Sequence, residues 1–146
     1  MNLLDPVSKI MTKNVKTVEP EDTMKKVEEI FKKEIFHHLP VLWQGNLVGM
    51  LSKTDYLFFK RGFNDDTSDE RIDAFRMKTR KVKDLMTSGL AYLEPTDKIN
   101  VALEVFKENL FHAIPVIDNG KLVGIISTFD IIDELSRTGT MEYNLK

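Results

Sequence analysis

The chain matches itself at a constant offset, and this internal repeat limits its fold more than any other feature. Identical residues recur 75 positions apart without a gap, from Val7 and Val82 to Asp55 and Asp130. Other identities are Met11 and Met86, Thr12 and Thr87, Pro40 and Pro115, Gly49 and Gly124, and Ser52 and Ser127. A unit of about 53 residues buries too little surface to be stable alone. We therefore expect the two copies to pack as one module with approximate twofold symmetry.

Each copy shows the same succession of hydrophobic patterns. Residues 15–18 alternate as a short strand, and a stripe at helical spacing follows, with Asp22 as the expected N-terminal cap. The stripe is Met24, Val27, Ile30 and Phe31 in the first copy and Ile99, Ala102, Val105, Phe106 and Leu110 in the second, where residues 90–93 form the strand and Asp97 the cap. Two more strands then flank Gln44-Gly45-Asn46 in the first copy and Asp118-Asn119-Gly120-Lys121 in the second, where Asn-Gly is a strong turn signal, so both segments predict hairpins.

A second helix follows each hairpin, so both copies read strand, helix, strand, strand, helix. This order predicts an α/β fold of the α+β type, in which each repeat has a small three-stranded mixed sheet with both helices on one side. We assign the first repeat to residues 7–59, a polar linker to 60–81, the second repeat to 82–135 and a frayed C-terminal tail to 136–146. A short helix starting at Ser68 or Asp69 and running through Ala74-Phe75 is expected in the linker.

Composition narrows the functional classes. The 146 residues are 42% hydrophobic and 30% charged, carry a net charge of −2 and include no Cys, which excludes disulfides and thiolate chemistry. No apolar run approaches the ~18 residues of a membrane span, so we expect a soluble cytoplasmic protein without membrane insertion. The basic run 76–83 has no interleaved aromatic residues and is interpreted as a solvated linker face, so no nucleic-acid partner is expected.

The candidate site is a motif that passes twice from strand to helix, as GMLSKTD at 49–55 and as GIISTFD at 124–130. Its glycine lets a ligand or another backbone approach the strand closely. Ser-x-x-Asp is a capping box, in which the two side chains satisfy backbone N–H groups and need no further role. The alternative is a nucleotide site, because the helix start and the hydroxyl suit phosphate and the carboxylate can accept hydrogen bonds from ribose hydroxyls.

Histidines open both hairpins, in FHHLPV at 36–41 and FHAIPV at 111–116. A lone His beside an apolar strand is usually a structural residue. His37 and His112 nevertheless occupy equivalent positions, and an imidazole near neutral pH is a reasonable phosphate partner. A metal site is not expected, because the chain has no Cys and no His-x-x-His or HExxH pattern.

The doubled arrangement strongly resembles tandem CBS domains, named after cystathionine β-synthase and together called a Bateman module. The resemblance rests on MTKNVKTVEPEDT through HHLPVLWQGNLVGMLSKTD and on MTSGLAYLEPTDK through HAIPVIDNGKLVGIISTFD, and it covers roughly residues 7–135. It implies a stand-alone sensor that reversibly binds an adenosyl compound such as AMP, ADP, ATP, NAD or S-adenosylmethionine in clefts between the repeats. It also implies a homodimer and an effector protein, with no cofactor besides the regulatory ligand.

In that family a cleft combines the Ser or Thr and the Asp of one repeat with the first strand and hairpin start of the other. By position, one cleft would use Met50, Ser52, Thr54 and Asp55 with Ala91, Phe111, His112 and Ala113. The other would use Ile125, Ser127, Thr128 and Asp130 with Lys16, Thr17, Phe36, His37, His38 and Pro40. Many relatives carry Arg where this chain has His38 and Ala113, so we expect the Asp130 cleft to bind nucleotides better.

Two other functional classes compete with this sensor. An enzyme is not expected, because the repeated Ser, Asp and His are not accompanied by a recognisable activating base or metal. A structural dimerisation module with degenerate clefts is the alternative, since capping boxes alone explain Ser-x-x-Asp.

Overall fold

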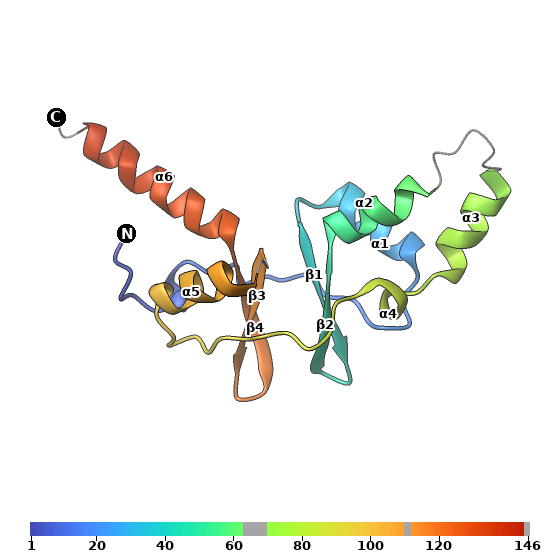
Figure 1. The fold of residues 1–146 in the computed structure, drawn as a ribbon, viewed down its shortest axis with the longest axis horizontal. Coiled ribbons are helices and arrows are strands. Elements are labelled where there is room, and N and C mark those ends of the chain that lie inside the picture. The colour runs from blue at the N-terminus through green and yellow to red at the C-terminus, as the bar shows by residue number, and fades with distance from the viewer. Residues whose placement is uncertain (63–69, 110–111, 145–146) are drawn as a thin grey trace. The chain divides into compact units, whose positions relative to one another are not determined.

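The computed structural model describes residues 1–62, 70–109 and 112–144, including their side chains except those of 109 and 138–144. Its elements are η1 (Val7–Lys9), α1 (Met24–Lys33), β1 (His38–Trp43), β2 (Asn46–Ser52), α2 (Lys53–Arg61), α3 (Glu70–Thr79), α4 (Val82–Leu85), α5 (Ile99–Asn109), β3 (Ala113–Asp118), β4 (Lys121–Ser127) and α6 (Thr128–Asn144) (Figure 1). The chain divides into unit 1, residues 1–15 and 91–146, and unit 2, residues 16–90.

The packing units do not coincide with the sequence repeats, because the start of each repeat packs with the remainder of the other. Val7, in η1, is fully buried in the core of unit 1 with Leu93 and Ile99. Val82, in α4, is fully buried in the core of unit 2 with Val18 and other residues of the first repeat. Each small core is thus completed by a side chain that lies far away in the sequence.

Each sheet has two antiparallel strands, β1 with β2 and β3 with β4, so the predicted three-stranded sheets were wrong in extent. The expected first strand is reduced to one parallel bridge, in which Val18 donates to the Pro40 carbonyl and accepts from the Leu42 N–H. Extending this pairing toward the N-terminus would require an N–H at position 40, which proline lacks. Leu93 is bonded to the Pro115 carbonyl in the same way.

The hairpin turns are confirmed. Gln44 and Gly45 have φ values of 49° and 80°, and Asn119 and Gly120 have φ values of 50° and 80°. Two consecutive residues with positive φ form the tight turn that matches the twist of an antiparallel pair. Three residues that we placed in the turns belong to strands: Asn46 begins β2, Asp118 ends β3 and Lys121 begins β4.

The predicted helical stripes are buried, but the predicted caps were wrong. Met24, Val27, Ile30 and Phe31 of α1 are buried; in α5, Ile99 and Ala102 are buried, Val105 and Phe106 are half-buried, and Leu110 lies outside the described residues. Thr23 caps α1 by accepting from the Lys26 N–H. Asp22 and Asp97 instead accept from the N–H groups of Glu19 and Glu94, at 2.8 Å in both cases. The short Asp side chain closes the turn before the helix.

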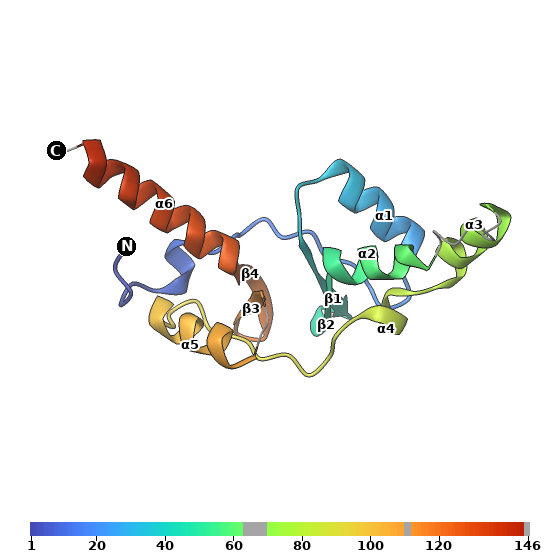
Figure 2. The same cartoon turned by 45° about the horizontal axis from the view of Figure 1, so that its top comes forward.

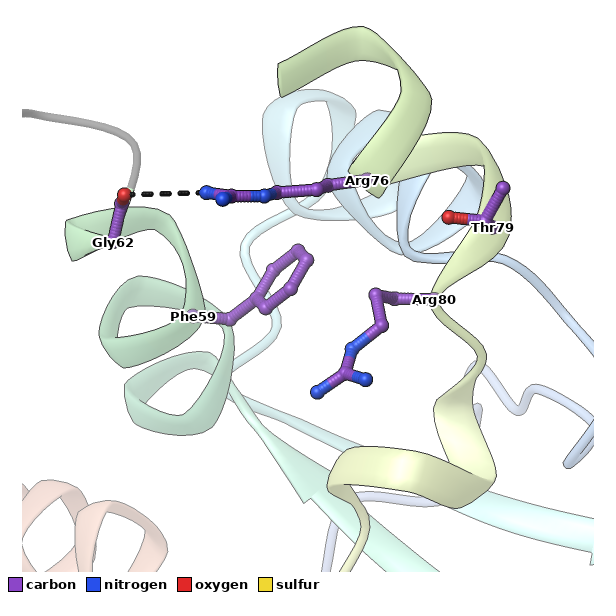
Figure 3. Close-up of a pocket in the computed structure, with 5 residues that line it drawn as sticks. All are labelled: Phe59, Gly62, Arg76, Thr79 and Arg80. Carbon is purple, nitrogen blue, oxygen red and sulfur yellow. Dashed lines mark hydrogen bonds between the residues drawn. The ribbon is translucent and has the colours of Figure 1, made fainter. Parts of the chain in front are cut away.

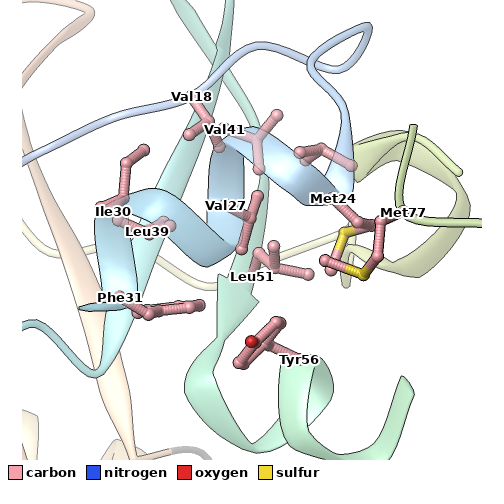
Figure 4. Packing of buried hydrophobic residues seen from close by; sticks show 11 residues of the cluster. Val18, Met24, Val27, Ile30, Phe31, Leu39, Val41, Leu51, Tyr56 and Met77 are labelled. Atoms are coloured by element: carbon pink, nitrogen blue, oxygen red, sulfur yellow. The ribbon is translucent and has the colours of Figure 1, made fainter. Parts of the chain in front are cut away.

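Figures 1 and 2 show α1 and α2 on one side of their hairpin and α5 and α6 on one side of theirs, as predicted. In the core of unit 2, the rings of Phe31 and Tyr56 lie 5.5 Å apart, and Met77 of α3 reaches Met24 (Figure 4). The linker therefore contributes to a core. Its helix ends at Thr79, and the expected starts Ser68 and Asp69 lie outside the described residues.

The C-terminal segment is more regular than expected. We predicted a frayed tail from residue 136, but α6 continues to Asn144. Within the described residues, every helix is too short or too polar to cross a membrane.

Candidate functional site

In unit 2 the candidate site is the junction at which β2 passes directly into α2. Ser52 is both the last residue of the strand and the N-cap of the helix. Its Oγ accepts from the Asp55 N–H at 3.0 Å, and Asp55 Oδ2 accepts from the Ser52 N–H at 2.9 Å. The capping box is thus confirmed, and it occupies only one of the two carboxylate oxygens of the half-buried Asp55.

The equivalent junction in unit 1 carries additional hydrogen bonds. Asp130 Oδ2 accepts from the Ser127 N–H at 2.7 Å and from the Ser127 hydroxyl at 2.9 Å, and Asp130 N–H donates to Ser127 Oγ at 3.1 Å. Asp130 Oδ1 also accepts from the Thr12 hydroxyl at 3.1 Å. No matching bond joins Thr87 to Asp55 in the described part of unit 2. Since a carboxylate offers about four acceptor positions, Asp55 retains more of its capacity.

The glycine of each motif is approached by another backbone. A Cβ on Gly49 would lie 2.6 Å from Met86 Sδ and 3.0 Å from the Thr87 carbonyl oxygen. Thr87 is held there by two 2.9 Å backbone hydrogen bonds with Met50. Gly124 is approached in the same way by the segment that contains Thr12. Of the two interpretations of this glycine, close approach of a backbone is the one that the structure supports.

The start of each hairpin lies beside the helix start of the same repeat. The contacts are the pairing of His38 with Ser52 and of Ala113 with Ser127, and hydrogen bonds from the Lys53 and Thr128 N–H groups to the carbonyls of His37 and His112 at 2.8 and 3.0 Å. The backbone carbonyls of His37 and His112 therefore have a structural role at the start of the following helix. The side chains of His37 and His112 are exposed, and neither forms a hydrogen bond or ion pair with another described residue.

The remaining predicted contacts differ in burial. Pro40, Met50, Ala113 and Ile125 are buried in the strands, whereas Lys16, Thr54 and Ala91 are exposed and Thr17, Phe36 and Thr128 are half-buried. Phe111 lies outside the described residues. Each predicted cleft takes residues from both unit 1 and unit 2, so the grouping into clefts stays a prediction.

Two features were missed by sequence reasoning. Thr12 was not recognised as a partner of Asp130, although the repeated Met-Thr pair at 11–12 and 86–87 marks this position. The basic run 76–83 was interpreted as uniformly solvated, yet Lys81 and Lys83 both pair with Glu21. Arg76 and Arg80, one helical turn apart, line a pocket. Their spacing of four residues was the available signal.

Comparison with known proteins gives a consistent assignment. The sequence pattern of the CBS domain matches the chain twice, at residues 7–62 and 82–137. An uncharacterized protein of Methanocaldococcus jannaschii, MJ1232, is 29% identical over 131 residues, which are 89% of this chain and 39% of that protein. The chain therefore spans about two fifths of the length of this relative.

Solved structures share the fold. The structure of CBSX2 in complex with AMP has a TM-score of 0.72 and 23% identity, covering 92% of this chain and 98% of that one. The CBS domain pair of protein MJ0100, in complex with 5-methylthioadenosine and S-adenosyl-L-methionine, has a TM-score of 0.73, 18% identity and the same coverage. The two-repeat α+β architecture is thereby confirmed.

Proposed function

Because this chain belongs to the CBS domain family as a tandem pair, we propose that it is a regulatory module that reversibly binds an adenosyl ligand between its repeats. Two CBS pairs of the same fold hold AMP, or 5-methylthioadenosine and S-adenosylmethionine. These three ligands differ in charge at the 5′ position and share adenosine. Recognition common to them must therefore act on the base and the ribose.

The observation that carries this proposal is the repeated helix start with a half-buried carboxylate. In each copy, Oδ2 of the Asp is bound to the N–H of the preceding Ser, which fixes the side chain. Within the described residues, Asp55 Oδ1 accepts no hydrogen bond, and Asp130 Oδ1 accepts one, from the exposed Thr12. A carboxylate that is oriented in this way can accept from a ribose hydroxyl without giving up the cap.

The competing function is a structural dimerisation module with degenerate clefts. It is favoured by the same hydrogen bonds, because both capping boxes are complete without a ligand. The two functions differ in what the second carboxylate oxygen does, and binding measurements separate them.

Calorimetric titration with AMP and with 5-methylthioadenosine tests the proposal on the wild type, Asp55→Asn and Asp130→Asn. Asn keeps an acceptor for the cap and removes the charge, so the fold is preserved while the ribose contact is weakened. We expect a loss of roughly tenfold or more in affinity, the worth of a hydrogen bond to a charged group. Asp118→Asn, at an exposed hairpin position, is the matched control. Absence of binding at millimolar ligand would establish the structural module instead.

We also propose that the ligand acts through a homodimer, as the family resemblance implies. Sedimentation equilibrium with and without AMP measures this relay directly. A change in the dimer dissociation constant is expected, because a ligand that binds one state better shifts the equilibrium toward it. Equal dimer dissociation constants with and without AMP would contradict a relay through dimerisation.

A further inference from the structure

Unit 2 contains a pocket that is separate from the Ser-Asp junctions. It is lined by Phe59 and Gly62 at the end of α2 and by Arg76, Thr79 and Arg80 at the end of α3 and just after it (Figure 3). Its volume of about 320 Å³ falls at the lower end of the range for small-molecule sites. All five of these residues belong to unit 2.

The charges on the lining favour an anion. Arg76 and Arg80 lie four residues apart in the sequence, and no acidic residue is among the described residues that line the pocket. Arg76 Nη1 donates to the Gly62 carbonyl at 3.5 Å, which carries its side chain across from α3 to the end of α2. Thr79 Oγ1 donates to the Phe75 carbonyl at 2.7 Å and can therefore only accept from a ligand. The cationic groups at Arg76 and Arg80 suit an oxyanion with several acceptor atoms.

An aromatic ring forms the apolar part of the pocket. Figure 3 shows the Phe59 ring extending from α2 into the space between Arg76 and Arg80. Phe59 is half-buried and packs against the core of unit 2, so its position is set by the fold. A planar group of a ligand can pack against this ring while its anionic end reaches the guanidinium groups.

The pocket is not a second copy of the repeated site. At an offset of 75, Phe59 corresponds to Glu134 and Gly62 to Arg137. Replacing the apolar ring by a carboxylate removes both the apolar surface and the selectivity for an anion. The α2 side of the pocket is therefore not repeated at the equivalent positions of α6.

We propose that this pocket binds a small phosphorylated molecule with a planar ring, whose phosphate contacts Arg80 and Arg76 and whose ring packs on Phe59. The proposal adds a second ligand site to the chain and does not depend on the adenosyl-binding function. It assigns a specific role to two residues of the basic linker run. Occupation would join the ends of α2 and α3.

Phenyl phosphate is the simplest probe, because it combines the two chemical features and lacks ribose. We would titrate it at constant ionic strength and follow amide shifts by ¹⁵N NMR, with inorganic phosphate in parallel. Saturable shifts are expected at residues 59–62 and 76–80, with inorganic phosphate binding more weakly. Arg80→Gln should weaken phenyl phosphate about tenfold, as expected for loss of one charge-assisted hydrogen bond. Arg80 is exposed, so this variant should fold normally.

Arg61→Gln is the matched control, because Arg61 is an exposed neighbour of Gly62 that does not line the pocket. It should leave the affinity unchanged, and Asp55→Asn should do the same. Phe59→Leu should weaken phenyl phosphate and leave the affinity for inorganic phosphate unaltered. Equal weakening by Arg61→Gln and Arg80→Gln would reduce the effect to general charge attraction and overturn the proposal. So would the absence of saturable shifts up to about 10 mM.

Discussion

Unit 2 joins its two repeat helices through a polar network, whereas unit 1 has apolar residues at the equivalent positions. The Tyr56 hydroxyl donates to Glu28 Oε2 at 2.7 Å, and Lys60 Nζ lies 3.1 Å from the same carboxylate oxygen. The offset of 75 places Leu103, Ile131 and Leu135 at these three positions of unit 1. Ile131 is buried, Leu103 is half-buried and Leu135 is 51% exposed, so the polar network of unit 2 is not repeated at these positions.

The two units carry the same residue at the positions where another backbone segment leaves no space for a side chain. Gly49 and Gly124 are both approached by a threonine carbonyl, at 3.0 and 2.9 Å from where a Cβ would lie. Helix contacts depend on side chains that can be exchanged as a set, while a close backbone approach has one solution. This explains why the duplicated units are identical at their glycines and differ in their helix contacts.

The largest effect is expected from Gly49→Ala and Gly124→Ala. The added methyl would lie 2.6 Å from Met86 Sδ in unit 2 and 2.7 Å from Met11 Sδ in unit 1. The methionines can move, but the threonine carbonyls are fixed by backbone pairing. We expect each substitution to lower the free energy of unfolding by about 2–3 kcal/mol, the upper range for overpacking. Urea denaturation followed by circular dichroism measures both variants.

Gly62→Ala is the control for these substitutions. Gly62 has a φ of −63°, and among the described residues its Cβ would meet only the Phe59 carbonyl oxygen, at an ordinary 3.5 Å. The free energy of unfolding of Gly62→Ala should therefore stay within about 0.5 kcal/mol of that of the wild type. Unequal losses for Gly49→Ala and Gly124→Ala would contradict the equivalence of the two backbone approaches.

A smaller effect is expected from breaking the polar network of unit 2. Tyr56 is 7% exposed, so Glu28→Leu leaves its hydroxyl without this acceptor, and Tyr56→Phe removes one of the hydrogen bonds that Glu28 accepts. Each single variant should cost about 1–2 kcal/mol. The double variant should cost about 1 kcal/mol less than their sum, because both partners have become apolar, as in unit 1. Trp43, the only Trp and a residue of unit 2, reports unfolding by fluorescence. An additive cycle would mean that the hydrogen bond does not couple the two helices.

Features set by neighbouring residues were predictable from the sequence. The Asn119-Gly120 turn and the Ser52 and Ser127 capping boxes involve residues three positions apart or fewer. The prediction of Asp22 as a helix cap was wrong because its carboxylate closes the preceding turn instead. An Asp just before a helix is typical of both arrangements, so the sequence does not distinguish them. Burial of Val82 with the first repeat was not predictable, since it depends on packing between segments that are distant in sequence.

The candidate site likewise combines local features that were predictable with long-range contacts that were not. The Ser and Asp of each junction were found because the repeat displays them twice in one motif. The Thr12 contact with Asp130 joins residues at opposite ends of the chain and has no local signal beyond the repeated Met-Thr. The pocket needs α2 and α3 side by side, and only the tertiary structure brings Phe59 to the arginines.

A pH-dependent difference between the units is expected from Glu21. Hydrogen bonds from Lys81 and Lys83 lower the pKa of Glu21 to about 2, and unit 1 has Thr96 at the equivalent position. A lowered pKa in the folded state means that the pair stabilises unit 2 above pH 4.5 and that this contribution is lost as pH falls toward 2. Glu21→Gln should therefore reduce the unfolding midpoint at pH 7 and show a smaller difference from the wild type at pH 3.

Because Glu21 is exposed, salt provides the control for this prediction. The stability difference at pH 7 should shrink in ~1 M NaCl, where charges are screened over about 3 Å. A difference that is independent of both salt and pH would show that Glu21 acts through packing and not through its charge.

The smallest effect, and the most direct test of the difference between the two junctions, is expected from Thr12→Val. The variant removes the hydroxyl that donates to Asp130 Oδ1 and keeps the shape of the side chain. If a ribose hydroxyl competes for this oxygen, affinity for AMP at the Asp130 junction should rise about two- to threefold, the worth of an exposed hydrogen bond. Thr87→Val, which makes no such bond in the described part of unit 2, should leave AMP binding unchanged. A decrease for Thr12→Val would mean that Thr12 orients Asp130 for the ligand, and the extra hydrogen bond would then favour the unit 1 junction over that of Asp55.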